Sequence, residues 1–205
     1  MSGHHGSVLK GKLLVANPAL RDPNFDRTVV LVLEHTEEGA LGLVLNRPSE
    51  TTVDDVLPQW ERLAAEPTVV FVGGPVQPSA AICVGRLNTS DGDDRAKGEL
   101  EPGPERPHKR EEGWKHLFMS LATVDLERDP DEIAELERVR VFAGYAGWGP
   151  GQLEGELEAE GWFVFDALPD DALSDRAEDL WRLVLRRQGG RFALLSTFPT
   201  DPSAN

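Results

Sequence analysis

Five histidines and one cysteine are the side chains of this chain best suited to acid–base, nucleophilic or metal chemistry. The histidines stand at positions 4, 5, 35, 108 and 116. No two of them are four residues apart, the spacing that places two imidazoles on one helical face for a metal ion. His35 lies among acidic residues, with Glu34 before it and Glu37 and Glu38 after it. That setting offers a carboxylate-rich metal candidate, but a solvated hairpin loop is the favoured interpretation.

Cys83 stands between apolar neighbours in AICVG, with no histidine close in sequence. A catalytic thiolate needs an activating base or a positive environment, so this pattern favours a buried, inert thiol over a redox site. A serine nucleophile is not indicated either, because neither G-x-S-x-G nor S-x-x-K occurs. We therefore expect no catalytic residues and no cofactor, and favour a non-enzymatic protein.

Two glycine clusters could bring backbone N–H groups close to a ligand. Gly147-Trp148-Gly149-Pro150-Gly151 lies between a predicted strand and a predicted helix, a position that can hold an anion. Its order matches neither the dinucleotide fingerprint nor the phosphate-binding loop, and the following helix is acidic. A tight turn that packs Trp148 is the favoured interpretation. For Gly73 and Gly74, close backbone packing ranks before ligand approach.

Arginines at 182, 186, 187 and 191 form the densest basic cluster of the chain. On one face they could contact phosphates. The favoured interpretation is structural, because cations stabilise a helix C-terminus and Glu178 is placed to pair with Arg182 four residues on.

Short apolar runs, many with β-branched residues, predict the strands that must position these side chains. They span residues 8–16, 28–33, 41–46, 68–74, 81–87, 116–121, 139–147, 162–167 and 192–196. Helices are predicted at 53–65 (broken near Pro58), 130–138, 151–160 and 174–187. The runs 28–33 and 41–46 predict an antiparallel hairpin. Strands and helices are interspersed without regular alternation, which indicates an α+β fold.

The segment at about 88–113 differs from the rest, since Ala96 and Leu100 are its only aliphatic side chains among charged residues, glycine and proline. Such a segment cannot bury enough apolar area to offset its ordering entropy, so we predict a disordered, charged loop. Strand-like sequence resumes after it. The loop is therefore expected to be an insertion within one domain that spans residues 1–205.

Composition excludes several classes of protein. The 205 residues carry 21 Lys and Arg against 36 Asp and Glu, a net charge of −15 that opposes strong direct DNA binding. No apolar run approaches the roughly 18 residues of a membrane span, and the first residues lack the apolar core of a secretory signal. We expect a cytoplasmic protein that does not enter membranes.

Three long blocks closely resemble the bacterial YqgE/AlgH family. They read GKLLVANPALRDPNFDRTVVLVLEHTEEGALGLVLNRP, then FVGGPV, then RVFAGYAGWGPGQLEGELEAEGWFV. The resemblance covers about residues 8–87 and 114–188, and the C-terminal sequence resembles actinobacterial members. It implies a single α+β domain in which a bent, bifurcated sheet forms a pseudo-barrel surrounded by helices. It also implies a cytosolic bacterial protein with no established enzymatic activity and no catalytic residues to carry over.

The family-like blocks place several residues at predicted strand ends and turns, where side chains can meet ligands. We predict a shared ligand or partner surface formed by His35, Asn46, Arg47, Gly73, Gly74, Gly147, Trp148 and Gly149.

Three hypotheses follow for the function. The first is a non-enzymatic protein that acts through a protein or small-molecule partner in transcriptional regulation, because one branch of the family is labelled a regulator of alginate production. The second is a binder of, or enzyme on, anionic, phosphate-bearing molecules at the 147–151 turn, with Arg47 as counter-charge. The third is an assembly protein whose exposed Trp60 or Trp148 marks an interface. The sequence leaves the partner and the oligomeric state open.

Overall fold

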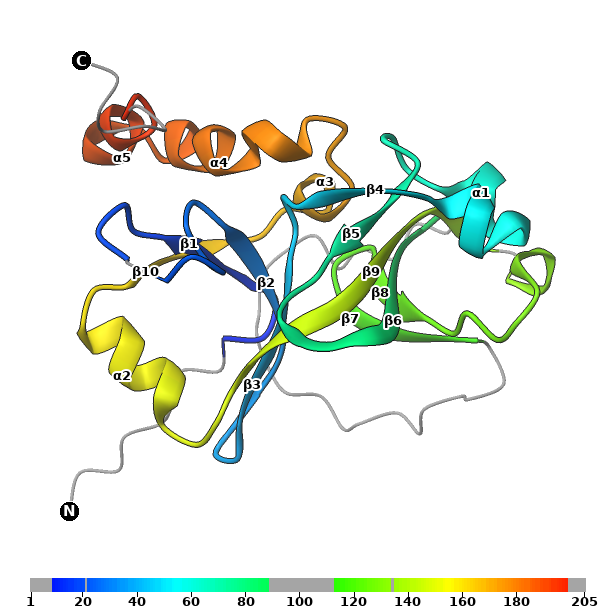
Figure 1. Cartoon of the computed structure of the whole chain (residues 1–205), viewed down its shortest axis with the longest axis horizontal. Helices are drawn as coiled ribbons and strands as arrows, with labels where there is room; N and C mark the ends of the chain where they lie inside the picture. Colours follow the sequence, from blue (N-terminus) through cyan, green and yellow to red (C-terminus); the bar gives the residue numbers. More distant parts are fainter. Residues whose placement is uncertain (1–8, 21, 89–112, 134, 199–205) are drawn as a thin grey trace.

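Ten strands form one strongly curved sheet in the computed structural model, which describes residues 9–20, 22–88, 113–133 and 135–198 (Figure 1). The strands are β1 (Lys12–Ala16), β2 (Val29–Thr36), β3 (Gly39–Val44), β4 (Pro48–Thr52), β5 (Val69–Val72), β6 (Val76–Leu87), β7 (Trp114–Phe118), β8 (Leu121–Val124), β9 (Leu136–Trp148) and β10 (Trp162–Asp166). The α-helices are α1 (Val53–Val56), α2 (Gln152–Glu158), α3 (Pro169–Ala172), α4 (Leu180–Gln188) and α5 (Gly190–Leu195), with 3-10 turns η1 (Pro58–Leu63), η3 (Pro130–Glu132) and η4 (Ala177–Asp179).

The main path through the sheet runs β10-β1-β2-β3-β9-β6-β8-β7, and every neighbouring pair along it is antiparallel. The sheet divides at β9. The C-terminal part of β9 pairs with β3, whereas residues 142–143 pair in parallel with β5, which in turn carries β4. This division matches the bifurcated sheet that the family resemblance implies.

The sheet curls so that the segment before β1 approaches the edge strand β7. A Cβ atom added at Gly11, just before β1, would lie 3.3 Å from Cγ of Phe118 at the end of β7. On the open side, α3 is linked to β6 by the ion pair between Asp170 and Arg86. The result is a half-barrel of strands with helices at its mouth, a mixed α+β fold as predicted.

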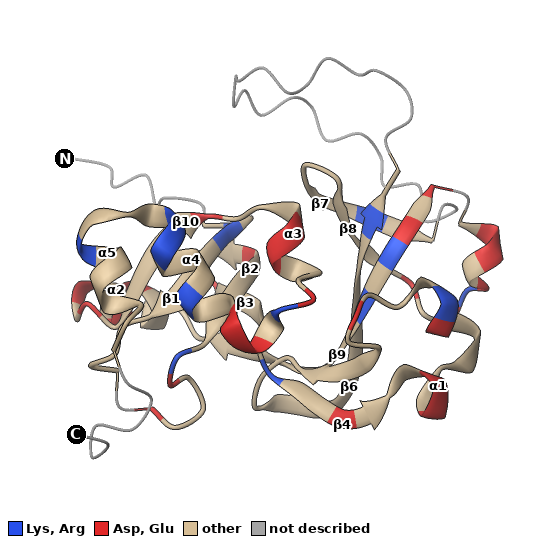
Figure 2. Cartoon of the chain, turned by 90° about the horizontal axis from the view of Figure 1, so that it is seen from above, with Lys and Arg blue, Asp and Glu red and all other residues tan. Residues whose placement is uncertain are grey.

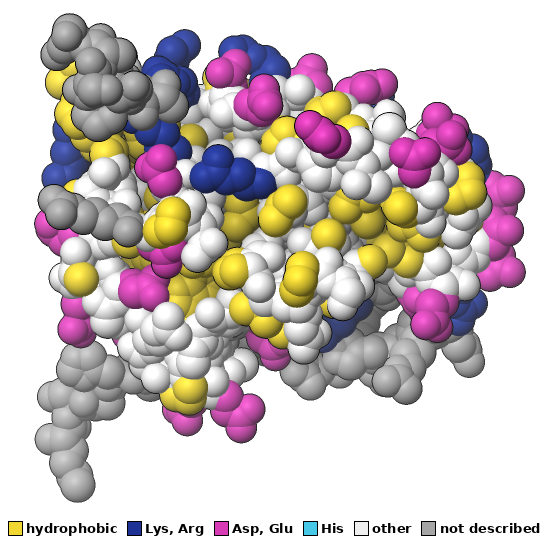
Figure 3. All heavy atoms as spheres, in the orientation of Figure 1, with side chains coloured by type: hydrophobic (Ala, Val, Ile, Leu, Met, Phe, Trp, Pro, Cys, Tyr) yellow, Lys and Arg dark blue, Asp and Glu magenta, His cyan; other side chains and the backbone are white. Residues whose placement is uncertain are grey.

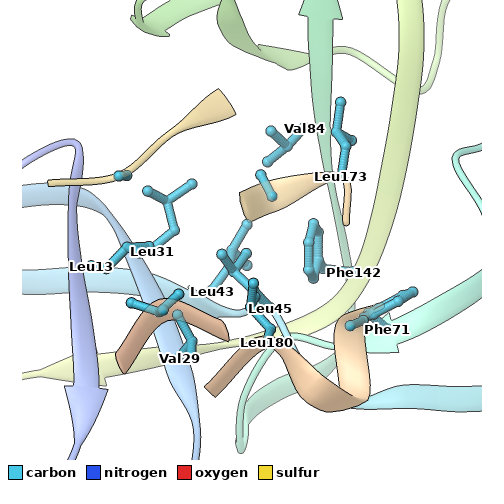
Figure 4. Packing of buried hydrophobic residues seen from close by; sticks show 14 of the residues in the cluster. Leu13, Val29, Leu31, Leu43, Leu45, Phe71, Val84, Phe142, Leu173 and Leu180 are labelled. Carbon is cyan, nitrogen blue, oxygen red and sulfur yellow. The ribbon is translucent and has the colours of Figure 1, made fainter. Parts of the chain in front are cut away.

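The main core lies between the curled sheet and the C-terminal helices. Figure 4 shows side chains of Leu13, Leu31 and Leu43 on one side facing Val84 and Phe142 on the other. From α4, the buried Trp181 donates its indole N–H to the carbonyl of Ala16, 2.9 Å away. Burial of this apolar area between the curled sheet and the helices stabilises the curl.

Most predicted elements are present, and the hairpin predicted from residues 28–46 is β2–β3 with Val30 opposite Val44. Three predictions were wrong. The single strand predicted at 116–121 crosses the turn at residues 119–120 that joins the antiparallel strands β7 and β8. Residues 192–196, predicted as a strand, lie mostly in α5, because a short apolar run does not by itself distinguish a strand from a helix. The helix predicted at 130–138 is only η3, after which β9 begins at Leu136.

The predicted loop at about 88–113 falls, from residue 89 to residue 112, outside the described residues. Within the described ranges, no helix is both long and apolar enough to cross a bilayer.

Candidate functional site

Both ring nitrogens of His35 form hydrogen bonds with other parts of the chain. Its Nδ1 accepts the backbone N–H of Leu9 at 3.3 Å, and its Nε2 lies 2.7 Å from Oε1 of Glu154 in α2. Since an N–H must donate, Nδ1 is the acceptor and the proton is assigned to Nε2, which donates to the carboxylate. The side chain is 8% exposed. His35 therefore joins Leu9, β2 and α2.

The carboxylate that pairs with His35 is that of Glu154, and not that of Glu37 or Glu38, which follow His35 closely in the sequence. Its own backbone N–H and then the His35 ring donate hydrogen bonds to it, and both lower the pKa of the Glu154 carboxyl. Among the described residues, no group of three or more His, Cys, Asp or Glu side chains is placed to hold a metal ion.

Trp148, at the end of β9, is one of two indoles that share a single carboxylate. Oε2 of Glu156 accepts the N–H of Trp148 at 2.9 Å and that of Trp162 at 2.8 Å. The two rings pack edge to face with centroids 6.1 Å apart, and Phe25 contacts both. Because buried indoles need an acceptor, Glu156 stabilises the packing of α2 on the sheet.

The glycine turn after β9 is closed by a side chain of α2. Gly149 donates its backbone N–H to Oε1 of Gln152 at 3.1 Å, and Gln152 in turn donates to Oε1 of Glu156 at 3.0 Å. Gly147 is still part of the ladder, opposite Leu41 of β3. This geometry fits the tight turn that packs Trp148, and anion binding at the turn stays a prediction.

Gly73 and Gly74 lie where β5 leaves the sheet, against the backbone of β9. A Cβ atom at Gly73 would lie 2.3 Å from the carbonyl oxygen of Gly144, and one at Gly74 would lie 2.1 Å from the carbonyl carbon of Tyr145. Any side chain would collide with main chain, so both positions require glycine. The close-packing interpretation accounts for both residues.

Asn46 and Arg47 follow β3 and bind the loop before β2. The amide of Asn46 accepts the N–H of Val29 at 2.9 Å and donates to the carbonyl of Arg27 at 2.8 Å, and the residue is buried. The exposed Arg47 donates to the carbonyl of Asp26 at 2.6 Å. Asn46 thus extends the β2–β3 pairing beyond its last strand residue.

The eight predicted site residues do not form one cluster. His35, Gly147, Trp148 and Gly149 lie around the start of β3, whereas Asn46 and Arg47 follow its end. Six strand residues separate these ends by about 20 Å. Arg47 is therefore far from the glycine turn for which it was predicted to supply the counter-charge.

Arg140 is a buried charge that the sequence analysis did not single out. It is 2% exposed and donates to the carbonyls of Glu66 at 2.6 Å and Ser174 at 2.9 Å, with its guanidinium 4.2 Å from the centroid of Phe71. Burial lowers the pKa of Arg140 to about 10. An arginine inside the apolar run VRVF was the available signal. Its partners are backbone carbonyls, so it ties two loops to β9.

Cys83 is buried on β6, and burial raises the pKa of its thiol, which agrees with an inert residue. It lines a shallow hollow of about 410 Å³ beside the end of β8, together with Val124, Asp125 and Glu127. A second hollow of about 310 Å³ contains Arg86, Glu137 and Asp170. None of the eight predicted site residues lines either hollow.

Two further predictions were wrong. Trp60 and Trp148 are both buried, so neither is the exposed anchor of an interface. Arg182 does not pair with Glu178; it donates to the carbonyls of Ser196 at 2.9 Å and Phe198 at 3.3 Å.

Comparisons with known proteins agree with one another. The AlgH-like family model matches residues 13–193. A UPF0301 protein of Mycobacteroides abscessus is 48% identical over 196 residues, covering 95% of this chain and 87% of the relative. A UPF0301 protein of Streptomyces coelicolor is 48% identical over 200 residues, covering 97% and 96%.

Two solved structures share the fold. The crystal structure of protein DIP2367 from Corynebacterium diphtheriae superposes with a TM-score of 0.78 at 34% identity, covering 93% of this chain and 92% of that one. The solution structure of the AlgH protein from Pseudomonas aeruginosa gives 0.61 at 26% identity, covering 98% and 100%. The sequence blocks, the divided half-barrel and these relatives lead to one conclusion: the chain belongs to the AlgH-like family.

Proposed function

We propose that this protein is a non-enzymatic, cytoplasmic regulator that influences transcription by binding a partner protein. The main support is that the side chains of the family-like blocks that could do chemistry form structural hydrogen bonds within the protein. His35 binds Leu9 and Glu154, and Glu156 binds two indoles. These groups hold the sheet and α2 together, so function is expected at the outer surface.

An indirect route to transcription fits the charge of the protein. At a net charge of −15, the average field repels the phosphates of DNA, and each phosphate contact would need a local cation. A regulator of this composition is expected to act on a protein. The regulatory part of the proposal rests on the family resemblance.

Deletion of the gene in its own bacterium, followed by transcript sequencing, tests the regulatory role. We expect a defined set of transcripts to change and to return to normal when the wild-type gene is restored. Unchanged transcripts under several growth conditions would count against regulation.

Fluorescence anisotropy with labelled genomic duplexes tests the indirect route. At about 150 mM salt we expect no sequence-specific binding by the purified protein. Tight binding to a particular duplex would overturn the indirect mechanism while leaving regulation itself intact.

The alternative function, binding of or catalysis on phosphate-bearing molecules at the 147–151 turn, receives less support from the geometry. The N–H of Gly149 already has an acceptor, and the carboxylates of Glu154 and Glu156 stand on the helix that follows. Thermal unfolding with a panel of phosphorylated metabolites tests it. A shift that grows in a Gln152→Ala variant, in which the N–H of Gly149 loses its acceptor, would support the alternative.

A further inference from the structure

We propose that the outer face of α5 and the adjoining part of α4 dock a short acidic segment of a partner protein that also carries apolar side chains. The surface consists of Arg186, Arg191, Leu194 and Phe198, and is called here the α4–α5 surface. This inference rests on the proposed function, because it names the chemistry of the partner.

The charge of this region is opposite to that of the whole chain. Residues 180–198 contain four arginines and neither Asp nor Glu, within a protein of net charge −15. Figure 2 shows these blue positions along α4 and at α5. In Figure 3, Lys and Arg side chains gather at the upper left, where Figure 1 places the two helices. The region is thus a local basic patch on an acidic molecule.

Two of the four arginines have structural partners. Arg187 forms a bidentate ion pair with Asp171, with N–O distances of 2.7 and 2.9 Å. Arg182 donates to the carbonyls of Ser196 and Phe198. Arg186 and Arg191 are exposed and form no ion pair with any described residue. Arg191 only lies over the ring of Phe192, 4.8 Å from its centroid. These two guanidinium groups are available to a ligand.

Apolar side chains lie beside these arginines. Leu194 is 70% exposed and Phe198 is 47% exposed, whereas Phe192 points inward and packs 5.1 and 5.0 Å from the rings of Phe163 and Phe165. Residues three apart share a helical face, so Arg191 and Leu194 lie together on the outer face of α5, and the exposed Phe198 lies in the turn that follows the helix. The hydrogen bonds from Arg182 to the carbonyls of Ser196 and Phe198 join the end of this segment to α4. Arg186 lies one helical turn after Arg182, on the same face of α4.

A short acidic segment fits this surface better than an extended polyanion does. Carboxylates pair with guanidinium groups through two hydrogen bonds, and apolar side chains of the segment would cover Leu194 and Phe198. A DNA duplex or an anionic membrane would also bring its charge close to the acidic surface around the patch. At physiological salt, charges more than about 8 Å apart are largely screened from each other. A short ligand bound at the patch would therefore interact little with the acidic residues around it.

Selection of displayed random peptides on the immobilised full chain tests the proposal. We expect the selected peptides to combine Asp or Glu with Leu, Phe or Ile. Synthetic copies should bind the full chain in solution, and binding should weaken at least tenfold when NaCl rises from about 50 mM to about 300 mM.

Variants locate the peptide site. The double change Arg186→Ala, Arg191→Ala and the single change Leu194→Ser should each weaken binding about tenfold, with unfolding temperatures unchanged because all three side chains are exposed. Arg176→Ala and Val56→Ser are matched controls at exposed positions elsewhere, and should leave binding unchanged.

Several results would overturn the proposal: no selected peptides, peptides without acidic residues, or equal losses in the control variants. Binding of vesicles of phosphatidylglycerol and phosphatidylcholine, or of duplex DNA, that is lost in the same surface variants would assign the surface to a lipid or nucleic acid instead. Peptide binding together with unchanged transcripts after gene deletion would retain the docking surface and reject the regulatory function.

Discussion

The helices α2 and α5 both flank the same half of the sheet (Figure 1), but they differ in how many of their side chains bind the rest of the protein. From α2, Gln152, Glu154 and Glu156 bind the glycine turn, His35 and two indoles. By contrast, α5 contains no buried residue and leaves Leu194 among the most exposed apolar side chains described. The residue types that suggested a site in the sequence serve to build the protein, and the surface with free groups lies elsewhere.

The largest expected effect on stability comes from the close approach of Gly74 to the main chain of β9, in the tightly packed part of the molecule. Gly74→Ala would place a Cβ atom 2.1 Å from the main chain of β9, so we expect a loss on the order of 3 kcal/mol of unfolding free energy. Thermal or urea unfolding measures it. Gly155→Ala, inside α2 with nothing within 4 Å of the new atom, is the matched control and should stabilise by about 0.5–1 kcal/mol. Similar losses in both would show that packing at Gly74 is not the cause.

Removal of the Glu156 carboxylate, which Trp148 and Trp162 share, should have the next largest effect on stability. Glu156→Ala leaves the indole N–H groups of Trp148 and Trp162 without their acceptor, and should cost about 2 kcal/mol, or a fall of about 4–8 °C in unfolding temperature. Calorimetry measures the loss, and the intrinsic fluorescence of the chain, to which these two of five tryptophans contribute, should change with it. Glu158→Ala, an exposed change in the same helix, should be nearly neutral. If the two variants behave alike, Glu156 does not hold α2 in place.

The His35–Glu154 bond predicts a smaller, pH-dependent effect. The folded-state pKa of Glu154 lies below its unfolded value, so its contribution is present above the unfolded pKa and is lost as the pH falls through the lowered folded value. Glu154 is half exposed, so we expect well under 1 kcal/mol. Wild type should exceed Glu154→Gln in stability near pH 7, and the difference should shrink below about pH 4.5. A difference that grows in acid would contradict this sign.

On the α5 side, the smallest effect on stability is expected. Leu194→Ser removes a side chain that is 70% exposed, so the unfolding free energy should change by no more than about 0.5 kcal/mol. Chemical denaturation of the purified variant measures this. A loss near 2 kcal/mol would show that Leu194 is packed, and would remove the contrast between the two helices.

Much of the fold could be predicted from local patterns. Apolar runs located β2, β3, β5 and β9, and the polar segment between residues 33 and 41 indicated the hairpin. These predictions succeeded because alternation and run length record how deeply each residue is buried. They were wrong at residues 192–196, where a run of that length is compatible with either a helix or a strand.

By itself, the sequence determined the class of fold, most of the strands, the family and the net charge that disfavours DNA. Only the tertiary structure decided what each polar side chain binds. Glu154 lies 119 residues from His35, and Trp181 lies 165 residues from the carbonyl of Ala16 that it binds. Local patterns report burial and periodicity, whereas a hydrogen-bond partner so distant in the chain is chosen by how the sheet curls. For the same reason the exposure of Leu194 beside unpaired arginines became visible only when α5 was placed on α4.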